Sequence, residues 1–455
     1  MNKSLFDDFE GVSPKEWKQK IQFDLKGADY NEALLHKSFE GIDIKPFYTT
    51  EDIPDSNNEV IHPTSWLNSV KIHIEESISG NTAIKNAINK GAESIYLIIS
   101  NKEVNPDKLL SNIPKKVPVY IETSFLSINY CKKLDLLASQ YDGTIFFLID
   151  IIGNLSKTGN WFKNLNNDYT SLTTILVENI YLKKLISIDM NLLQNAGATM
   201  VQQLAYGLAH ANEYLNYLEN NNTLPFNTVS FIFKVAIGSN YFFEIAKIRA
   251  LRILWNTLSS EYNTIKQCQI IASPSHRNKT FLDYNVNMLR TTTECMSAIL
   301  GGADIIYNLS YDDVYNPENK FGTRIAINQL LILKNESHFN IVNNPASGSY
   351  YIEDLTHQLS EKALLLFKNI EKSGGYLNQL KKGTIQKKIK ESADKEQELF
   401  DHKSIIMTGA NKYKNEGQIP SSFQKNTLIN KKPIKTLLNP IITRRLCEKI
   451  EKKSL

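Results

Sequence analysis

The chain has 455 residues, of which 42% are hydrophobic and 22% charged, and its 52 basic and 48 acidic residues leave a formal net charge of +4. These values are typical of soluble globular proteins and exclude a disordered chain, and so balanced a charge argues against a nucleic-acid partner. The length exceeds what one hydrophobic core usually fills, so we expect a large domain with long extensions, or two domains.

The spacing of the cysteines and the length of the apolar runs further restrict the class of protein. The four cysteines form no close pair of the kind found in zinc or redox motifs, so we expect buried thiols and no metal site. The strongest apolar run, residues 144–152, is interrupted by Asp150 and falls far short of the roughly 20 residues that span a bilayer. The N-terminus lacks an apolar segment of signal-peptide length. We therefore expect a cytoplasmic protein with no membrane partner.

Residues 1–90 are predicted to form an N-terminal arm with short helices. This part carries few strand signals, and residues 46–49, Pro-Phe-Tyr-Thr, have the composition of a turn. Large apolar residues such as Trp17 stand among charged ones. An arm of this kind is suited to a subunit interface.

From residue 91 onward, short β-branched and aromatic runs alternate with longer stretches of helical period, a pattern typical of parallel strands joined by crossover helices. We predict eight strands, near residues 94–99, 117–121, 144–148, 185–189, 229–235, 267–272, 303–307 and 339–342. The predicted fold class is α/β, a (β/α)8 TIM barrel over residues 91–360. An open doubly wound sheet remains the alternative, because a strand count from one sequence is uncertain by one or two.

The C-terminal part, residues 361–455, is predicted to be a helical extension and tail. Its lysine-rich run between Lys381 and Lys388 is expected to be a solvated helix face. In the preceding barrel, Arg290 and Glu294 are four residues apart, so we expect them to form an ion pair on one helix.

Several motifs in register resemble the methylmalonyl-CoA mutase family. The longest, Asn-Met-Leu-Arg-Thr-Thr-Thr-Glu at residues 287–294, continues to the Gly-Gly-Ala-Asp of residues 301–304. Other matching pieces lie in the expected order, at residues 24–31, 41–49, 194–198, 244–250, 344–351 and 409–413. The resemblance covers almost the whole chain, and several motifs in order make it specific.

The resemblance implies a TIM barrel from a family that interconverts methylmalonyl-CoA and succinyl-CoA in propionate metabolism. In its catalytic chains the barrel holds the acyl-CoA, and a C-terminal flavodoxin-like domain presents adenosylcobalamin, with a histidine of an Asp-x-His-x-x-Gly loop on the cobalt. None of the eight histidines here stands in such a loop, and the chain ends about where that domain would begin. We therefore expect this chain to lack the cobalamin-binding domain and to bind no cofactor directly.

Two further departures concern the groups that touch substrate in catalytic chains. Where the family shows Tyr-His before Met-Gln-x-Ala-Gly-Ala, this chain has Asn191 and Leu192, and leucine has no donor with which to polarise a thioester carbonyl. Where the family shows an arginine and a tyrosine after an early tryptophan, Trp66 is followed by a segment with only Lys71, which lacks arginine's planar fork. We expect no catalytic residues, with Asn191, Leu192 and Lys71 degenerate.

The preferred hypothesis is a small, structural subunit in a heterodimer with a large catalytic subunit that carries the adenosylcobalamin. Following the resemblance, residues 1 to about 65 are expected to form the tightest interface, with Trp17, Phe23, Phe47 and Tyr48 as apolar anchors. The chain alone is expected to be inactive.

Two alternatives remain. The chain could be a catalytic mutase barrel that borrows a separately encoded cobalamin-binding chain, or a barrel with a new acyl-CoA activity built on polar groups near strand ends, such as Lys234. The weak candidates for substrate binding are His276, Ser273 and Asp189. Bulky side chains at successive positions of residues 95–99 and 145–148 predict instead a filled barrel interior.

Overall fold

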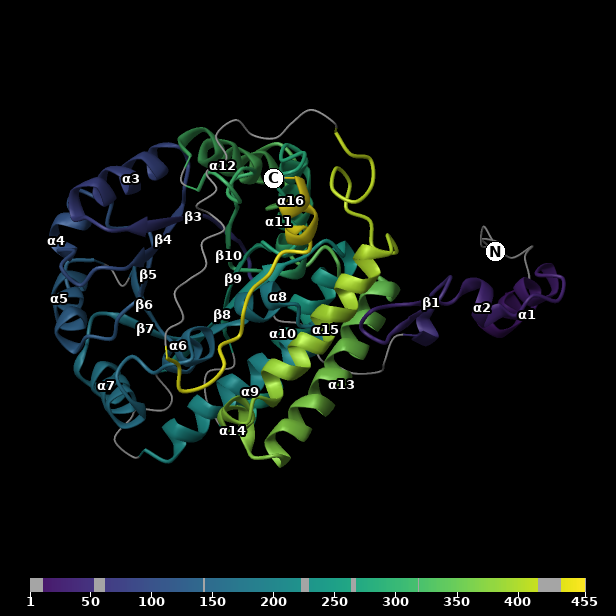
Figure 1. The fold of residues 1–455 in the computed structure, drawn as a ribbon, viewed down its shortest axis with the longest axis horizontal. Helices are drawn as coiled ribbons and strands as arrows, with labels where there is room; N and C mark the ends of the chain where they lie inside the picture. The colour runs from purple at the N-terminus through teal and green to yellow at the C-terminus, as the bar shows by residue number, and fades with distance from the viewer. Residues whose placement is uncertain are drawn as a thin grey trace, which may run out of the picture.

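Eight parallel strands close into a barrel in the order β10-β3-β4-β5-β6-β7-β8-β9 (Figure 1). The computed structural model describes residues 11–52, 62–141, 144–221, 229–262, 267–317, 319–415 and 435–454. The barrel strands are β3 (Leu67–Ile74), β4 (Ser94–Ile99), β5 (Val119–Thr123), β6 (Ile145–Ile149), β7 (Lys183–Asp189), β8 (Ser230–Ile237), β9 (Gln269–Pro274) and β10 (Ile305–Tyr307). The predicted (β/α)8 TIM barrel is confirmed, and the open sheet is excluded.

One predicted strand is wrong and one real strand was missed. Residues 339–342 form turns, not a strand, and the Trp66 indole Nε1–H donates to the Phe339 carbonyl at 3.2 Å just before β3. The missing strand is β3, which lies inside the range assigned to the arm, so the barrel sheet begins at residue 67 rather than 91. On β3 the polar residues Lys71 and His73 line the lumen, which explains the lack of a continuous apolar run.

Helices surround the barrel, and further helices come before and after it in the chain (Figure 1). The helices of the barrel ring are α3 (Ser77–Asn89), α4 (Pro106–Leu109), α5 (Ile128–Ala138), α6 (Ile151–Thr158), α7 (Leu165–Glu178), α8 (Met190–Ala196), α9 (Met200–Glu219), α10 (Tyr241–Glu261), α11 (Val286–Gly301) and α12 (Lys320–Asn335). Three more, α13 (Tyr350–Lys372), α14 (Gly375–Lys381) and α15 (Thr384–Asp401), follow the barrel; α13 packs on α9 and α10. Within the described parts of the chain, every helix is too short or too polar to cross a bilayer.

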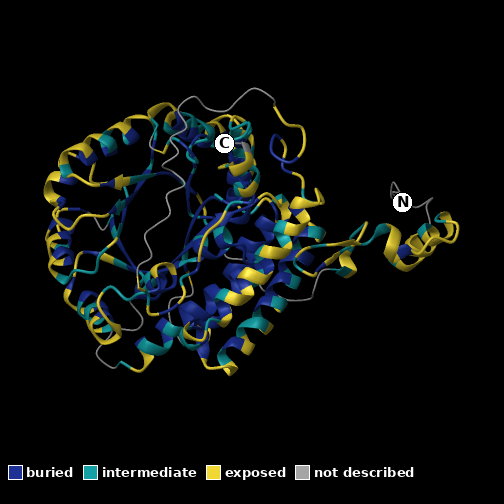
Figure 2. Ribbon diagram, viewed as in Figure 1, coloured by how far each residue is buried: buried dark blue, intermediate teal, exposed yellow. Residues whose placement is uncertain are grey.

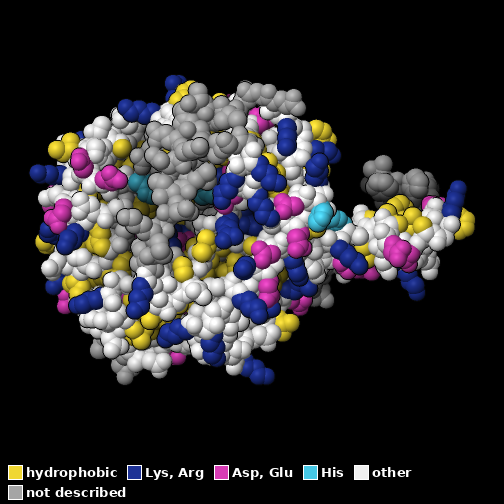
Figure 3. Space-filling model, viewed as in Figure 1, with side chains coloured by type: hydrophobic (Ala, Val, Ile, Leu, Met, Phe, Trp, Pro, Cys, Tyr) yellow, Lys and Arg dark blue, Asp and Glu magenta, His cyan; other side chains and the backbone are white. Residues whose placement is uncertain are grey.

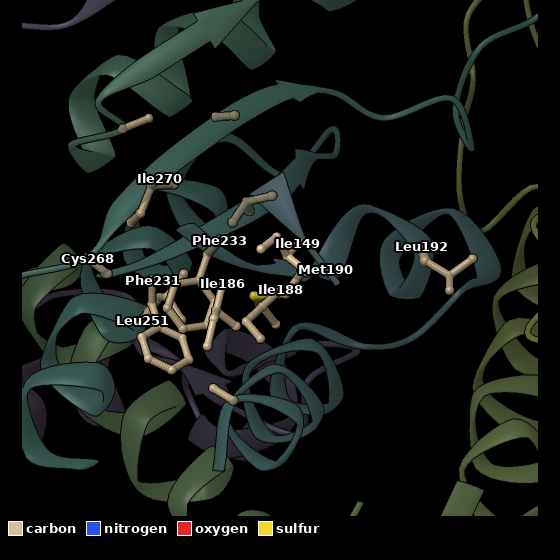
Figure 4. Close-up of a cluster of buried hydrophobic side chains, with 14 of the residues drawn as sticks. Ile149, Ile186, Ile188, Met190, Leu192, Phe231, Phe233, Leu251, Cys268 and Ile270 are labelled. Atoms are coloured by element: carbon tan, nitrogen blue, oxygen red, sulfur yellow. The ribbon is translucent and has the colours of Figure 1, made fainter. Parts of the chain in front are cut away.

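The main hydrophobic core lies between the outer face of the barrel and the helices, where most buried residues are found (Figure 2). Phe231 and Phe233 of β8 pack against Trp255 of α10, and their ring centroids lie 4.7 and 5.4 Å, respectively, from that of Trp255. Figure 4 shows Phe231 and Phe233 in the cluster that also contains Leu251 of α10. Each such side chain stabilises the fold by about 1.5–3 kcal/mol when it is removed from water. All four cysteines are free and buried, as expected.

The N-terminal arm projects away from the barrel (Figure 1). Its elements are α1 (Pro14–Asp24), α2 (Tyr30–Leu34), β1 (His36–Lys37), β2 (Asp43–Ile44) and the 3-10 turn η1 (Thr50–Asp52). A Ser13–Glu16 capping box begins α1, yet no residue of α1 is buried. The arm is anchored by Glu40, whose two carboxylate oxygens accept the backbone N–H groups of Met200 and Val201 at 2.8 and 3.0 Å, at the first turn of α9.

The last described segment crosses the mouth of the barrel before the final helix, α16 (Glu448–Ser454) (Figure 1). We call residues 435–446 the strap. Its backbone N–H groups at Leu438, Ile441 and Arg444 donate to Gly159, Ser156 and Asn195, at 3.2, 2.9 and 3.0 Å. The strap therefore holds together the loops and helices that follow β6 and β7.

Two side-chain predictions for the outer helices had opposite outcomes. The lysines of the run between Lys381 and Lys388 are exposed on α14 and α15, as expected. The expected Arg290–Glu294 ion pair is wrong, because Glu294 turns inward and binds Lys279 at 2.8 Å in a buried pair. Arg290 instead donates to Asn287 Oδ1 at 2.8 Å and to the Thr408 carbonyl.

Candidate functional site

A cavity of about 430 Å³ lies at the carboxyl ends of the barrel strands. In parallel barrels the strand ends and the loops that follow them converge there, so residues far apart in sequence share one site. The residues singled out from the sequence all line this cavity: Lys71, Asp189, Asn191, Leu192, Ser273 and His276. The structure thus brings together both the degenerate positions and the weak substrate-binding candidates, although it assigns none of them a role.

An ion pair crosses the lumen, and both of its residues line the cavity. Lys234 of β8 places its Nζ 2.8 Å from Glu122 Oε2 of β5, although β6 and β7 stand between these strands in the barrel. The hydroxyl of Tyr96 on β4 also donates to Glu122, and Asp189 Oδ2, on the strand next to Lys234, lies 3.3 Å from its Nζ. We call the Glu122–Lys234 pair the crossbar.

The surroundings hold both ends of the crossbar in their charged forms. Burial by itself would favour the neutral acid, but the Lys234 ammonium and the hydrogen bonds from Lys234 and Tyr96 outweigh it and lower the pKa of Glu122 to about 2. Burial likewise opposes the charge on Lys234, yet Asp189 and Glu122 raise its pKa well above the ordinary value. A lysine held this way cannot serve as a neutral base near pH 7.

Aromatic and aliphatic side chains fill the barrel below the crossbar. Tyr120 and Phe146 stack with ring centroids 4.7 Å apart, and Tyr96 meets Tyr307 at 5.7 Å. They belong to a separate buried cluster with Leu148, Leu185, Ile232, Ile271, Ile305 and Leu309. The predicted filled interior is therefore found in the lower part of the barrel, whereas the polar cavity above it was not anticipated. Together the cluster and the crossbar obstruct the lumen.

The two substituted positions begin α8, directly after β7. Asp189 caps this helix by accepting the Leu192 N–H at 3.3 Å, which presents Asn191 and Leu192 to the cavity. Leu192 lies on α8 to one side of the packed group around Phe233 (Figure 4). Its side chain is aliphatic and 7% exposed, so this part of the wall offers no hydrogen-bond donor from that side chain.

Two histidines near the cavity have different surroundings. His276 lies 3.4 Å from Asp313, measured from Nδ1 to Oδ2, and burial lowers its pKa despite that carboxylate. It follows β9, the seventh barrel strand, rather than the sixth strand counted from the sequence, because β3 was missed. His210 is buried on α9, where its Nε2 lies 3.0 Å from Asp150 Oδ1 and its ring stacks on Tyr376. That arrangement leaves His210 in a structural role.

Sequence reasoning missed Glu122, Tyr96 and Asp150 as cavity residues. Glu122 stands in the apolar stretch Val-Tyr-Ile-Glu-Thr, and a lone carboxylate near the carboxyl end of a predicted strand was the available signal. Asp150 was noticed only as an interruption of an apolar run. For Glu122 and Asp150 the strand end, where barrel side chains converge, was the feature that pointed to the cavity; Tyr96 lies in the middle of β4 and carried no such signal.

The chain was compared with known proteins. Residues 115–447 match the family model described as methylmalonyl-CoA mutase. The small subunit of methylmalonyl-CoA mutase from Porphyromonas gingivalis is 31% identical over 448 residues, covering 90% of this chain and 71% of that protein. The small subunit from Propionibacterium freudenreichii subsp. shermanii is 27% identical, covering 82% of this chain and 64% of its own length.

Longer relatives match only part of the chain. The methylmalonyl-CoA mutase of Rhizobium meliloti is 36% identical over 244 residues, which is 52% of this chain and 34% of that protein. Among solved structures, a dihydropteroate synthase from Thermus thermophilus aligns over 60% of this chain and 95% of its own, with 10% identity and a TM-score of 0.32. The two proteins named small subunit align over 90% and 82% of this chain, compared with 52% for the Rhizobium meliloti mutase.

Proposed function

The chain belongs to the methylmalonyl-CoA mutase family, and on that basis we propose that it is the small, non-catalytic subunit of an adenosylcobalamin-dependent mutase. The interconversion of methylmalonyl-CoA and succinyl-CoA is then carried out by a separate large subunit. The two relatives named small subunit support this role, because their alignments cover 90% and 82% of this chain.

The observation that carries the proposal is the obstructed barrel. An acyl-CoA that enters a barrel along its axis needs an open lumen with small inward side chains. Here the crossbar spans the lumen and the Tyr120–Phe146 stack fills the space below it. At the cavity wall, Leu192 stands where the family uses a histidine on the thioester carbonyl, so a substrate that reached the mouth would receive no hydrogen bond from this side chain.

The cofactor is assigned to the large subunit by the same reasoning. A corrinoid presented across the barrel mouth would supply the radical chemistry of the family. The residues at this mouth do not fit it, because the strap occupies the mouth with backbone hydrogen bonds and Thr443 of the strap lines the cavity. No step of the reaction is assigned to this chain.

The arm supports the proposed heterodimer. Trp17 is 51% exposed and Phe23 79% exposed on α1, a capped helix that buries none of its residues in this chain. Figure 3 shows hydrophobic side chains on the surface of the projecting arm. Of the other expected anchors, Phe47 packs against Trp17, and Tyr48 packs against Tyr351 of the same chain. The partner contact is therefore proposed for α1, and residues 1–10 and 53–61 of the expected interface lie outside the described residues.

A cytoplasmic location in propionate metabolism is proposed as well, in agreement with the family. Burial raises the pKa of Cys131 to about 12, so this thiol stays protonated and unreactive. Neither the site nor the comparisons favour a catalytic barrel served by a separately encoded cobalamin chain.

Co-expression tests the proposal directly. With the large chain encoded beside it, this chain should co-purify one to one, and mutase activity and corrinoid absorption should follow the large chain alone. Activity recovered by mixing this chain with only an isolated cobalamin-binding domain would contradict the assignment.

A further inference from the structure

The carboxylate of Glu40 makes all of the hydrogen bonds that join the arm, residues 11–52, to the other residues that the structure describes. Its two oxygens accept the backbone N–H groups of Met200 and Val201 at 2.8 and 3.0 Å. Ile42, which is fully buried, anchors the arm in the main core by apolar contact. The polar attachment of the arm to the barrel therefore depends on one side chain.

Through this side chain the arm supplies part of the N-terminal cap of α9. The first backbone N–H groups of a helix have no partner within the helix. Thr199 caps the third of them, that of Gln202, at 3.2 Å, whereas Glu40 takes the first two, on Met200 and Val201. Loss of Glu40 would leave the first turn of α9 with only its own cap.

The strap is anchored a few residues earlier in the chain, where it passes α8 (Figure 1). The Arg444 N–H donates to the carbonyl of Asn195, in the last turn of α8, at 3.0 Å. The side chain of Asn195, which lines the cavity, accepts from Ser275 Oγ and from the His276 N–H, each at 2.9 Å. The segment 195–201 therefore binds the strap and the loop after β9 at one end and the arm at the other.

The corner between α8 and α9 is packed closely. Gly197 ends α8 with a left-handed φ of +95°, and a Cβ there would lie 2.6 Å from Ala393 Cβ and 2.8 Å from Arg277 Cζ. The Gly197 carbonyl also accepts the Ser392 hydroxyl at 2.8 Å. Closely packed elements in direct contact shift together, because the interior has few voids in which a displacement could be absorbed. Movement of the first turn of α9 is therefore passed on to α8.

We propose that the arm and the strap are coupled through residues 195–201, so that release of Glu40 from α9 loosens the strap at the mouth of the barrel. The two states are the arm with its carboxylate bound to α9 and the arm released from it. In the released state the first turn of α9 frays, and the Asn195 carbonyl loses its fixed position under the Arg444 N–H. The contact of the strap with Gly159, at the end of α6, does not involve this corner and stays intact.

The coupling gives a partner of the arm an effect on the mouth. For a large subunit that binds the arm, assembly then changes how firmly the strap is held. That consequence rests on the proposed function, whereas the coupling itself rests on contacts within one chain. Its test needs no partner, so it can fail while the subunit assignment stands.

Hydrogen exchange of the full-length chain, resolved to single amides by mass spectrometry with electron-transfer fragmentation, tests the coupling. In Glu40→Ala the amides of Met200 and Val201 should exchange about tenfold faster, because they lose their acceptor. The Arg444 amide should exchange about fivefold faster. The Leu438 amide, which donates to Gly159 at the end of α6, should keep the wild-type rate. Unchanged exchange at Arg444 would overturn the proposal, as would unchanged exchange at Met200 or equal acceleration at Leu438.

Matched variants separate the coupling from a general effect on the fold. Glu51→Ala is the control, since Glu51 is an exposed carboxylate of the same arm, and all of these amides should keep their wild-type rates. Thr199→Ala removes the cap that α9 itself supplies and should also speed exchange at Arg444. Circular dichroism checks that each variant is folded. Faster exchange at Arg444 in Glu51→Ala, or a response to Thr199→Ala but not to Glu40→Ala, refutes the coupling of arm and strap.

Discussion

Lys234 and Glu122 are separated by 112 residues in sequence and by two strands in the barrel, yet their Nζ and Oε2 atoms lie 2.8 Å apart across the lumen. This contact ties one side of the barrel to the other below the mouth. Substitution of either residue should destabilise the fold, because each buried charge is stabilised by the opposite charge of its partner.

Removing the cation should destabilise the chain more than removing the anion. Lys234→Met leaves Glu122 and Asp189 without their shared cation, and we expect a loss of about 3–5 kcal/mol in the free energy of unfolding. Glu122→Gln should cost less, about 1–3 kcal/mol, because Lys234 keeps Asp189 at 3.3 Å. Chemical denaturation of both variants measures the difference. An equal loss, or a larger one for Glu122→Gln, would mean that Asp189 does not compensate.

The crossbar should also contribute to acid sensitivity. The pKa of Glu122 falls from an ordinary value of 4.5 to about 2 in the folded chain. A depressed carboxyl pKa contributes stability that is fully present above pH 4.5 and is lost as the pH falls toward 2. The free energy of unfolding, followed from pH 6 to pH 2, should therefore decline less steeply in Glu122→Gln than in the wild type. Glu75→Gln, an exposed position, should retain the wild-type slope.

Substitutions at two glycines with the same φ angle distinguish the effect of contact with the strap from the effect of backbone strain. Gly159 and Gly348 both have φ of +79°, but a Cβ at Gly159 would lie 2.5 Å from the Leu438 carbonyl oxygen, whereas nothing lies within 4 Å at Gly348. Gly159→Ala should speed amide exchange at Leu437, Leu438 and Ile441, which hydrogen-bond around α6. Gly348→Ala carries the same strain and should leave the strap protected. If both variants exchange alike, the strap does not depend on this contact.

The exposed face of α1 should matter for assembly and not for the stability of the chain alone. Trp17→Ser and Phe23→Ser should reduce co-purification with the large chain, because hot spots at interfaces are usually large apolar residues. The melting temperature of Phe23→Ser should stay within about 1 °C of the wild type, since surface substitutions usually change stability by less than about 0.5 kcal/mol. Leu136→Ser is the control, at a residue 71% exposed on α5. Loss of the complex in that control would indicate a different interface.

Much of the barrel could be predicted from sequence because seven strands are apolar runs between helices of clear period. The strand at Leu67–Ile74 could not, since its inward face carries Ser69, Lys71 and His73 and so breaks the apolar pattern. Residues 339–342 were wrongly predicted to be a strand for the opposite reason, because they are mostly apolar but do not belong to the sheet. Ile341 is 70% exposed in a turn, although its β-branched neighbourhood resembles a strand. Local composition does not report which face of a strand meets water.

The site was predicted as a set of positions but not as an arrangement. His276, Ser273 and Asp189 converge because they stand at or just beyond strand ends, and that follows from topology alone. The pairing of Lys234 with Glu122 and of Glu294 with Lys279 depends on side-chain direction in three dimensions. A spacing of four residues predicted Arg290 as the partner of Glu294, but Glu294 instead binds Lys279, a buried residue of the loop before α11.

The strap has a consequence for how the protein is made. Its hydrogen bonds connect residues 435–446 to positions near 156 and 195, so they form only after the strap itself has been synthesised. Because domains begin to fold during synthesis, the nascent barrel passes through an interval in which its eight strands are paired but its mouth is uncovered. During that interval the cavity at the strand ends lacks the part of its wall that Thr443 of the strap supplies.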